Sequence, residues 1–216
     1  MIWFTSDLHL KHPSIIHLGN GRPFDSLQRM EAYLIDAIND HVSPDDTLWV
    51  LGDFYMRGTP GKVAPYLERI ACADVRLVRG NHDRLFGYGG GGFEGRRFSS
   101  VSDYAELADP LGDGSRFVLS HYPMLDWDRM YHGSYMLHGH IHSWPAGDAA
   151  KFVGPRFVTH EHGLLGYNGW NRANGIRRYD VGVDANGYAP VSMEKIVAFF
   201  DGMELACLGA REGEWA

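Results

Sequence analysis

Apolar and polar positions follow two different periods along the chain. Short apolar runs predict buried strands, and these runs cover residues 2–6, 47–51, 75–78, 116–120, 135–137 and 178–183. Apolar residues that recur every three or four positions predict helices. Such helices are expected over residues 27–38 and 61–71, with a last one between Ser192 and Gly202. Because helices alternate with strands, we predict an α/β layered fold.

The size and composition of the chain fit one globular domain over residues 1–216. Of the 216 residues, 44% are hydrophobic and 22% are charged, so the chain can bury a substantial core. Its formal net charge is −7, which argues against an extended basic surface for nucleic acid. The net charge does not exclude small phosphate-bearing substrates, because bound metal ions could supply positive charge locally.

The sequence has no feature typical of a secreted or membrane-inserted protein. Its two cysteines, Cys72 and Cys207, have apolar neighbours and no metal-ligand spacing, so we expect buried thiols. The first residues lack the charged and apolar regions of a signal peptide. No apolar stretch reaches membrane-spanning length. These features predict a soluble, cytoplasmic protein that acts without a membrane, and they leave the oligomeric state open.

Side chains that can bind metal ions or carry protons follow five of the predicted strands. In chain order they are Asp7, His9, Asp53, Asn81, His82, Asp83, His121, His140 and His142. The carboxyl ends of strands are where an open α/β sheet usually places its ligand site. Nitrogen and oxygen ligands without thiolates suit one or two divalent ions such as Mn²⁺, Fe or Zn²⁺.

The ordered motifs resemble those of the calcineurin-like metallophosphoesterases. They are Asp7-x-His9, Gly52-Asp53, Gly80-Asn81-His82-Asp83, His121 and Gly139-His140-x-His142. Three further phrases, Arg22-Pro23-Phe24, Leu119-Ser120-His121-Tyr122-Pro123 and Val181-Gly182-Val183-Asp184, are similar to a small bacterial and phage branch of this superfamily. The resemblance implies a two-sheet β-sandwich flanked by helices, in four layers ordered α-β-β-α. It also implies hydrolysis of phosphate esters with two divalent metal ions as cofactors.

The resemblance further implies a role for each of these residues. Asp7, His9 and His142 would bind the first ion, Asn81, His121 and His140 the second, and Asp53 would bridge the two. Mn²⁺ is the expected ion, while Fe, Zn²⁺, Ni²⁺ and Mg²⁺ suit the same ligands. A metal-bridging hydroxide would attack phosphorus. His82 would protonate the leaving oxygen as general acid, and Asp83 would orient His82 and raise its pKa.

Two questions about function stay open from the sequence. The substrate is expected to be a phosphate ester, with a nucleotide as one candidate, and the enzyme could be a phosphodiesterase or a phosphatase. We favour phosphodiesters, because the chain is acidic and shows no obvious arginine cluster for a dianionic phosphate. A catalytically inactive scaffold that binds partner proteins is an alternative on the same fold. Such a scaffold would tolerate loss of His82 or the bridging Asp53, and both are present.

Residues 143–177 show no clear periodicity and are predicted to form a loop insertion directly after His142. Their aromatic residues, arginines and glycines suit a flap that covers the metal site and selects the substrate. A surface segment packed on the edge of the sandwich is the alternative. Arg22 could bind a substrate phosphate or pack its own loop. We expect His138 in the core or behind the ligands, and His12 at the surface or in a loop.

Overall fold

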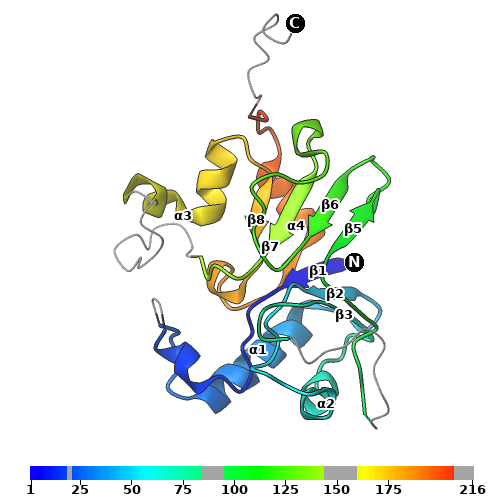
Figure 1. Cartoon of the computed structure of the whole chain (residues 1–216), viewed down its shortest axis with the longest axis vertical. Helices are drawn as coiled ribbons and strands as arrows, with labels where there is room; N and C mark the ends of the chain where they lie inside the picture. The colour runs from blue at the N-terminus through cyan, green and yellow to red at the C-terminus, as the bar shows by residue number, and fades with distance from the viewer. Residues whose placement is uncertain (19–20, 84–94, 144–159, 207–216) are drawn as a thin grey trace, which may run out of the picture.

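Two β-sheets lie face to face, and helices cover their outer sides (Figure 1). The computed structural model describes residues 1–18, 21–83, 95–143 and 160–206, with only the backbone described over residues 160–164. The predicted fold class, two sheets flanked by helices, is thereby confirmed. None of the helices in these described ranges is long and apolar enough to cross a membrane.

The first sheet has five strands in the order β4-β3-β2-β1-β9. They are β1 (Ile2–Thr5), β2 (Thr47–Val50), β3 (Asp74–Val78), β4 (Ser100–Ser102) and β9 (Val191–Ser192). β1 to β4 are parallel, whereas β9 is antiparallel to β1. Two helices, α1 (Leu27–His41) and α2 (Pro60–Leu67), connect the first three strands. α1 begins after Ser26, whose hydroxyl accepts the backbone N–H of Arg29 at 3.3 Å.

The second sheet has four strands in the order β5-β6-β7-β8. They are β5 (Ala105–Ala108), β6 (Arg116–Leu119), β7 (Tyr135–His138) and β8 (Arg178–Asp180). β6, β7 and β8 are parallel, and β5 is antiparallel to β6. The helix α3 (His160–Ala173) lies against β8, and α4 (Met193–Phe200) follows β9.

Alternate residues of the central strands face two different cores. Leu48 of β2 packs in the cluster formed with α1 and α2, whereas its neighbour Trp49 faces the second sheet. Phe117 of β6 faces the core between the sheets, which also contains Phe200 of α4, and Val118 faces a smaller outer cluster. Because both faces of these strands are covered, their sequences appear as continuous apolar runs instead of an alternating pattern.

The two sheets meet at the carboxyl ends of their parallel strands. Ser6, just after β1, forms an isolated parallel bridge with Gly182, just after β8. The backbone N–H of Val183 donates to the carbonyl oxygen of Ser6 at 3.1 Å. The loops that follow the parallel strands of both sheets are therefore joined at one edge of the sandwich.

The prediction that residues 143–177 form an irregular loop is wrong for residues 160–173, which form α3. Glycines interrupt its apolar pattern, and Gly166, with φ 66° and ψ 169°, kinks the helix. Contacts with β8 compensate for this weak helical sequence. The side chain of Asn168 donates to the Asp180 carbonyl at 3.0 Å and accepts the Asp180 N–H at 2.7 Å. Residues 144–159, which the predicted flap includes, lie outside the described residues.

Sequence patterning also misses the short strands β4, β5 and β9. They are two to four residues long, and β4 and β5 are partly exposed, so none of them forms a buried apolar run. The strand expected over residues 178–183 ends at Asp180, and a 3₁₀ turn follows over Val183–Ala185.

Candidate metal centre

The loops after β1, β2, β3, β6 and β7 bring the nine predicted site residues together at the edge where the sheets meet. The backbone N–H of Asp7 donates to the carbonyl of Gly52 at 3.0 Å, and that of His9 donates to the carbonyl of Asp53 at 2.9 Å. Across the second sheet, the N–H of Gly139 donates to the carbonyl of His121 at 3.1 Å. Both sheets therefore contribute side chains to one site.

Five of the predicted metal ligands have left-handed backbone angles. The φ values are 60° for Asp7, 51° for His9, 52° for Asp53, 72° for His140 and 46° for His142. A non-glycine residue in this region costs about 1–3 kcal/mol, and such residues concentrate at functional sites. Strained backbone angles are therefore concentrated at the residues that direct their side chains into the site.

The carboxylate of Asp7 has one fixed oxygen and one without a hydrogen-bond partner. Its Oδ2 accepts the backbone N–H of His140 at 2.9 Å. Its Oδ1 is buried without a hydrogen-bond partner and lies 3.8 Å from the Nε2 atoms of both His9 and His142. Because buried polar atoms are nearly always satisfied, this oxygen marks a place where a cation fits.

The carboxylate of Asp53 likewise has one oxygen that accepts a backbone N–H and one that faces histidine side chains. Its Oδ1 accepts the backbone N–H of His82 at 2.9 Å. Its Oδ2 lies 3.5 Å from Nε2 of His9 and 3.5 Å from Nε2 of His121. One carboxylate oxygen therefore stands between two histidines that come from different sheets.

The histidines use one ring nitrogen for support and leave the other facing the site. Nδ1 of His121 lies 2.8 Å from the carbonyl oxygen of Leu51, and Nδ1 of His142 lies 2.7 Å from Oδ2 of Asp184. The Nε2 atoms of His9 and His142 are 3.1 Å apart. Support of one nitrogen by a carbonyl or carboxylate is typical of metal-bound histidine, because it fixes the tautomer and the ring orientation.

The second half of the site is more open to solvent. Oδ1 of Asn81 lies 3.1 Å from Nε2 of His121, and the ring of His140 is 4.9 Å from that of His121. His140 is exposed. The ring of Tyr122 lies 4.6 Å from His140 and 5.0 Å from His121, measured between centroids, and Tyr122 is 47% exposed. This half can therefore receive a ligand from solvent.

Arg22 and Asp184 hold His142 in place, a role that the sequence does not reveal. Arg22 donates from Nε and Nη2 to the two carboxylate oxygens of Asp184 at 3.0 and 2.8 Å. It also donates to the carbonyl of Asp7 at 2.7 Å and to that of Leu8 at 3.2 Å, and Nη1 contacts the sulfur of Met30. Because its five N–H donors are engaged in this way, Arg22 packs its own loop, and the proposal that it binds a substrate phosphate loses support.

The electrostatic surroundings differ among the histidines. Burial and the neighbouring His142 lower the pKa of His9, and burial and His121 lower the pKa of His140, so both favour the neutral form that binds metals. Burial opposes charge on His142, but the carboxylates of Asp7 and Asp184 outweigh it and raise its pKa to about 9. A cation held by Oδ1 of Asp7 and Nε2 of His142 would take the place of the proton on Nε2.

The expected contact between Asp83 and His82 is not observed. Oδ2 of Asp83 accepts the backbone N–H of Asp53 at 2.6 Å and that of Gly80 at 2.9 Å. Within the described ranges, no hydrogen bond or ion pair joins Asp83 to His82. Burial raises the pKa of the Asp83 carboxyl to about 6. Asp83 therefore positions the loop that carries Asp53, because one hydrogen bond comes from the backbone N–H of Asp53 itself and the other from that of Gly80 in the next loop.

His82 and His12 line the rim of the site. Nε2 of His82 lies 3.9 Å from Oδ2 of Asp53, and its side chain is 23% exposed. His12 was expected only at the surface or in a loop, yet its Nδ1 lies 3.3 Å from Nδ1 of His9 and its ring is 5.8 Å from His82. His138 is buried with Nδ1 2.9 Å from the carbonyl of Gly139, as predicted.

Glycines in the motifs permit close packing around the two carboxylates. A Cβ at Gly80 would overlap Oδ1 of Asp53 and lie 2.7 Å from its backbone nitrogen. A Cβ at Gly139 would overlap Oδ2 of Asp7 and the hydroxyl of Ser6. Real Cβ atoms do not approach so closely, so the glycines are required by the position of the carboxylates.

Comparisons with known proteins agree with the geometry. A family model described as calcineurin-like phosphoesterase matches residues 1–185. An uncharacterized protein of Methanocaldococcus jannaschii is 26% identical over 200 residues, which cover 93% of this chain and 91% of that protein. The Gene 66 protein of Mycobacterium phage L5 is 31% identical over 196 residues, with 79% of this chain and 87% of that protein covered. The crystal structure of a protein of unknown function from Aquifex aeolicus shares the fold, with a TM-score of 0.61, 23% identity, and coverage of 92% of this chain and 98% of that one.

Proposed function

The chain belongs to the calcineurin-like phosphoesterase family, and we propose that it is a two-metal phosphodiesterase. The proposal is carried by the arrangement of Asp7 and Asp53. Each carboxylate has one oxygen bound by a backbone N–H, and its other oxygen faces two or more imidazole nitrogens. This arrangement concentrates negative charge and neutral nitrogen donors at one point of the molecule.

The residues of the site fit two divalent cations. Asp7, His9 and His142 would hold one ion, Asn81, His121 and His140 the other, and Asp53 would contact both. The described part of the chain contains three triads of aspartate and histidine residues, and within each triad the potential ligand atoms lie within 4.8 Å of one another. The triads share residues, so they form one continuous site. When bound, such cations polarise phosphoryl oxygens and lower the pKa of coordinated water. Nitrogen and oxygen donors suit Mn²⁺ first, and also Fe, Zn²⁺, Ni²⁺ or Mg²⁺.

In this proposal His82 acts as the general acid. Its side chain is partly exposed at the rim, and its Nε2 lies 3.9 Å from Asp53, so the ring is close to the ligands and open to a bound substrate. A proton given by His82 to the leaving oxygen spares the substrate from releasing an alkoxide. Asp83 contributes indirectly, because it fixes the backbone of the loops that carry Asp53 and Asn81.

The arginine beside the site favours a substrate with one negative charge. A dianionic phosphomonoester is best bound by a free arginine fork, but Arg22 is engaged with Asp184 and backbone carbonyls. A diester carries one charge fewer. The exposed ring of Tyr122 beside His140 suits a planar group on the substrate, such as the base of a nucleotide. An inactive scaffold would not explain why residues with strained backbone angles bring these potential metal ligands together.

A panel of metals and substrates tests this function. The protein is loaded in turn with Mn²⁺, Zn²⁺, Ni²⁺, Fe²⁺ or Mg²⁺ and assayed on bis(p-nitrophenyl) phosphate, p-nitrophenyl phosphate and a cyclic nucleotide. We expect a kcat/KM at least tenfold higher on the diester than on the monoester. A tenfold preference for the monoester would contradict the substrate class, and no hydrolysis with any of the metals would contradict the enzymatic function.

A further inference from the structure

A second polar pocket lies at the far end of the second sheet from the metal centre. It has a volume of about 310 Å³, and its lining includes Asp113, Ser115, Arg116, Arg129, His132 and Arg177. The metal-site residues His121 and His140 follow the carboxyl ends of β6 and β7, whereas Arg116 opens β6 and Arg177 precedes β8. A strand of four residues spans roughly 13 Å, so the pocket, at the start of β6, is separate from the site that follows the end of this strand.

The pocket gathers positive charge in a chain that is acidic overall. Arg116, Arg129 and Arg177 come from three different segments, and His132 adds an imidazole. Asp113 is the single carboxylate in the lining, and its Oδ1 already accepts the backbone N–H of Ser115 at 2.9 Å. Among the residues that the structure describes, neither Arg116 nor Arg129 has an ion pair or hydrogen bond through its side chain. These two guanidinium groups are therefore free to bind an anion.

Arg177 is held in a fixed orientation at the wall of the pocket. It donates from Nη1 to the carbonyl of Gly133 at 2.7 Å and stacks over the ring of Tyr135 at 4.8 Å. Tyr135 in turn stacks on Phe117, with 4.6 Å between ring centroids and 10° between planes. The Nε of Arg177 is buried without a hydrogen-bond partner, whereas the buried hydroxyl of Ser115 interacts with the Asp113 carboxylate. A buried guanidinium donor without a partner in the wall of the pocket indicates that a ligand completes it.

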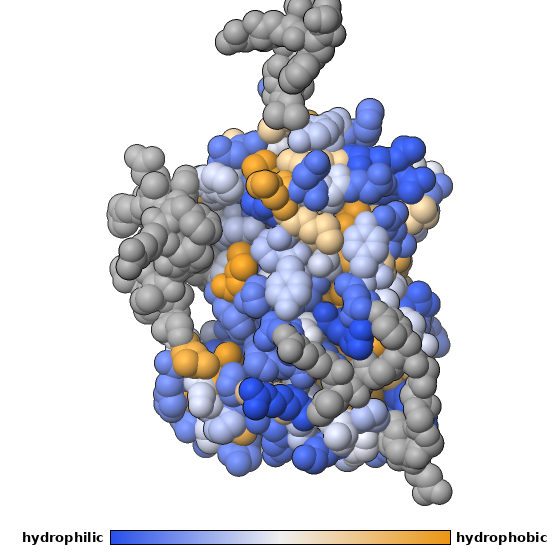
Figure 2. Space-filling model, in the orientation of Figure 1, coloured by the Kyte–Doolittle hydropathy of each residue, from blue (hydrophilic) through white to orange (hydrophobic). Residues whose placement is uncertain are grey.

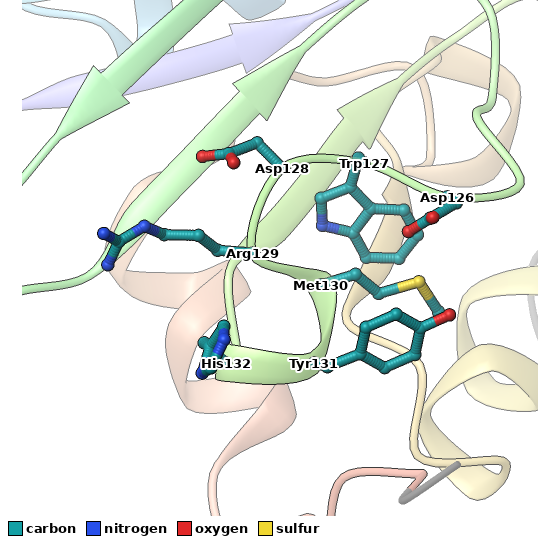
Figure 3. Close-up of a pocket in the computed structure, with 7 residues that line it drawn as sticks. All are labelled: Asp126, Trp127, Asp128, Arg129, Met130, Tyr131 and His132. Carbon is teal, nitrogen blue, oxygen red and sulfur yellow. The ribbon is translucent and has the colours of Figure 1, made fainter. Parts of the chain in front are cut away.

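Arg129 and His132 also line a neighbouring open hollow of about 570 Å³. In Figure 3, the side chains of Asp128, Arg129 and His132 extend to one side of the loop. The side chains of Asp126, Trp127, Met130 and Tyr131 lie on the other side. Tyr131 is half exposed. The polar pocket therefore continues into a hollow whose walls combine aromatic and thioether side chains with the carboxylates of Asp126 and Asp128. Outside the grey atoms, hydrophilic residues cover most of the face of the molecule that Figure 2 shows.

We propose that this pocket binds the phosphate group of a small organic phosphate, at a site separate from the metal centre. Guanidinium groups bind phosphate oxygens through paired hydrogen bonds. Arg116 and Arg129 supply guanidinium groups without other partners in the described ranges, while the Nε of Arg177 supplies a donor that is already in place. The organic part of the ligand lies toward Tyr131. Inorganic phosphate alone is a second source of the same chemistry.

Two probes distinguish these sources, inorganic phosphate and phenylphosphonate, whose carbon–phosphorus bond a phosphoesterase does not cleave. The protein is loaded with diamagnetic Zn²⁺, and binding is followed by amide chemical shifts in two-dimensional NMR. The amides of Ser115 and Gly133 report on the pocket, and that of His140 reports on the metal centre. We expect both probes to shift Ser115 and Gly133, with tighter binding of phenylphosphonate if the hollow takes the organic part.

The variant R116Q/R129Q should bind either probe at the pocket at least tenfold more weakly, equivalent to about 1.4 kcal/mol, and should keep the wild-type shift at His140. Arg69→Gln removes an exposed arginine after α2 and serves as the matched control, with unchanged affinity. If the double variant fails to fold, Arg129→Gln alone, in an exposed loop, tests the same prediction. Pocket amides that do not respond to either probe, or an unchanged affinity in the variants, would overturn the proposal.

Discussion

Replacement of Arg22 by methionine should destabilise the fold far more than its position in a loop would suggest. Arg22 and Asp184 form an ion pair with Nη2 and Oδ2 2.8 Å apart, and their side chains are only 2% and 17% exposed. Methionine fills similar space but removes the guanidinium that binds both carboxylate oxygens of Asp184, which leaves His142 as the remaining charged partner. It also removes the donors to the carbonyls of Asp7 and Leu8.

The expected loss in the free energy of unfolding is about 3–5 kcal/mol, the usual cost of removing one partner of a buried ion pair. The matched control is Arg29→Met. Arg29 pairs with Asp25 at 2.7 Å, but the two side chains are 74% and 82% exposed. For such a surface pair the loss should be at most about 1 kcal/mol. Replacing both Arg22 and Asp184, as in R22M/D184N, should restore part of the stability because no buried carboxylate is then left without its guanidinium partner.

Urea unfolding of the metal-free proteins, followed by tryptophan fluorescence and far-UV circular dichroism, measures these differences. Work without metal separates the stability of the scaffold from metal binding. If Arg22→Met is no less stable than Arg29→Met, the ion pair with Asp184 does not support the site in the way we describe. A double variant less stable than Arg22→Met would contradict the cost of leaving the Asp184 carboxylate without its guanidinium partner.

Three further predictions concern the chemistry of the metal centre. His82→Ala should keep its metals but lose about 10²–10⁴-fold in kcat on an alkyl ester, and less on a nitrophenyl ester that needs little protonation; equal losses would argue against general-acid catalysis. Tyr122→Ala should raise KM for an aryl diester and not for a methyl diester, while Tyr122→Phe retains the wild-type KM; equal KM changes on both substrates would exclude ring stacking. Gly139→Ala should lose metal affinity in equilibrium dialysis because its Cβ overlaps the Asp7 carboxylate, whereas Gly169→Ala in α3 should not; normal affinity in Gly139→Ala would refute the packing argument.

Sequence reasoning succeeded where a side chain directly follows a buried strand. The runs that end before Asp7, Asp53 and His121 are apolar on both faces, so the strand and its end are visible in the sequence. Parallel strands then bring such ends to one edge. Asp184 and Arg22 could not be assigned in the same way, because they are 162 positions apart and meet only in the folded chain.

The incorrect sequence predictions also have physical causes that lie in the folded structure. α3 is interrupted by glycines, and its stability depends on bonds such as those between Asn168 and Asp180, which no local pattern encodes. Asp83 is adjacent to His82 in sequence, yet its carboxylate turns to backbone N–H groups of other residues. The arginines of the second pocket come from separate segments and form a cluster only through the order of the strands.

The metal content of wild type and Asp53→Ala tests the central claim most directly. Oδ2 of Asp53 faces His9, His82 and His121, and Asp53 is the residue that we propose to contact both ions. After reconstitution with Mn²⁺ and dialysis, mass spectrometry should find two ions per chain in the wild type and in Asp36→Ala, a control on the exposed face of α1. Asp53→Ala should lose both ions together with hydrolysis of the diester. Full occupancy in Asp53→Ala would contradict a centre in which Asp53 holds both metals.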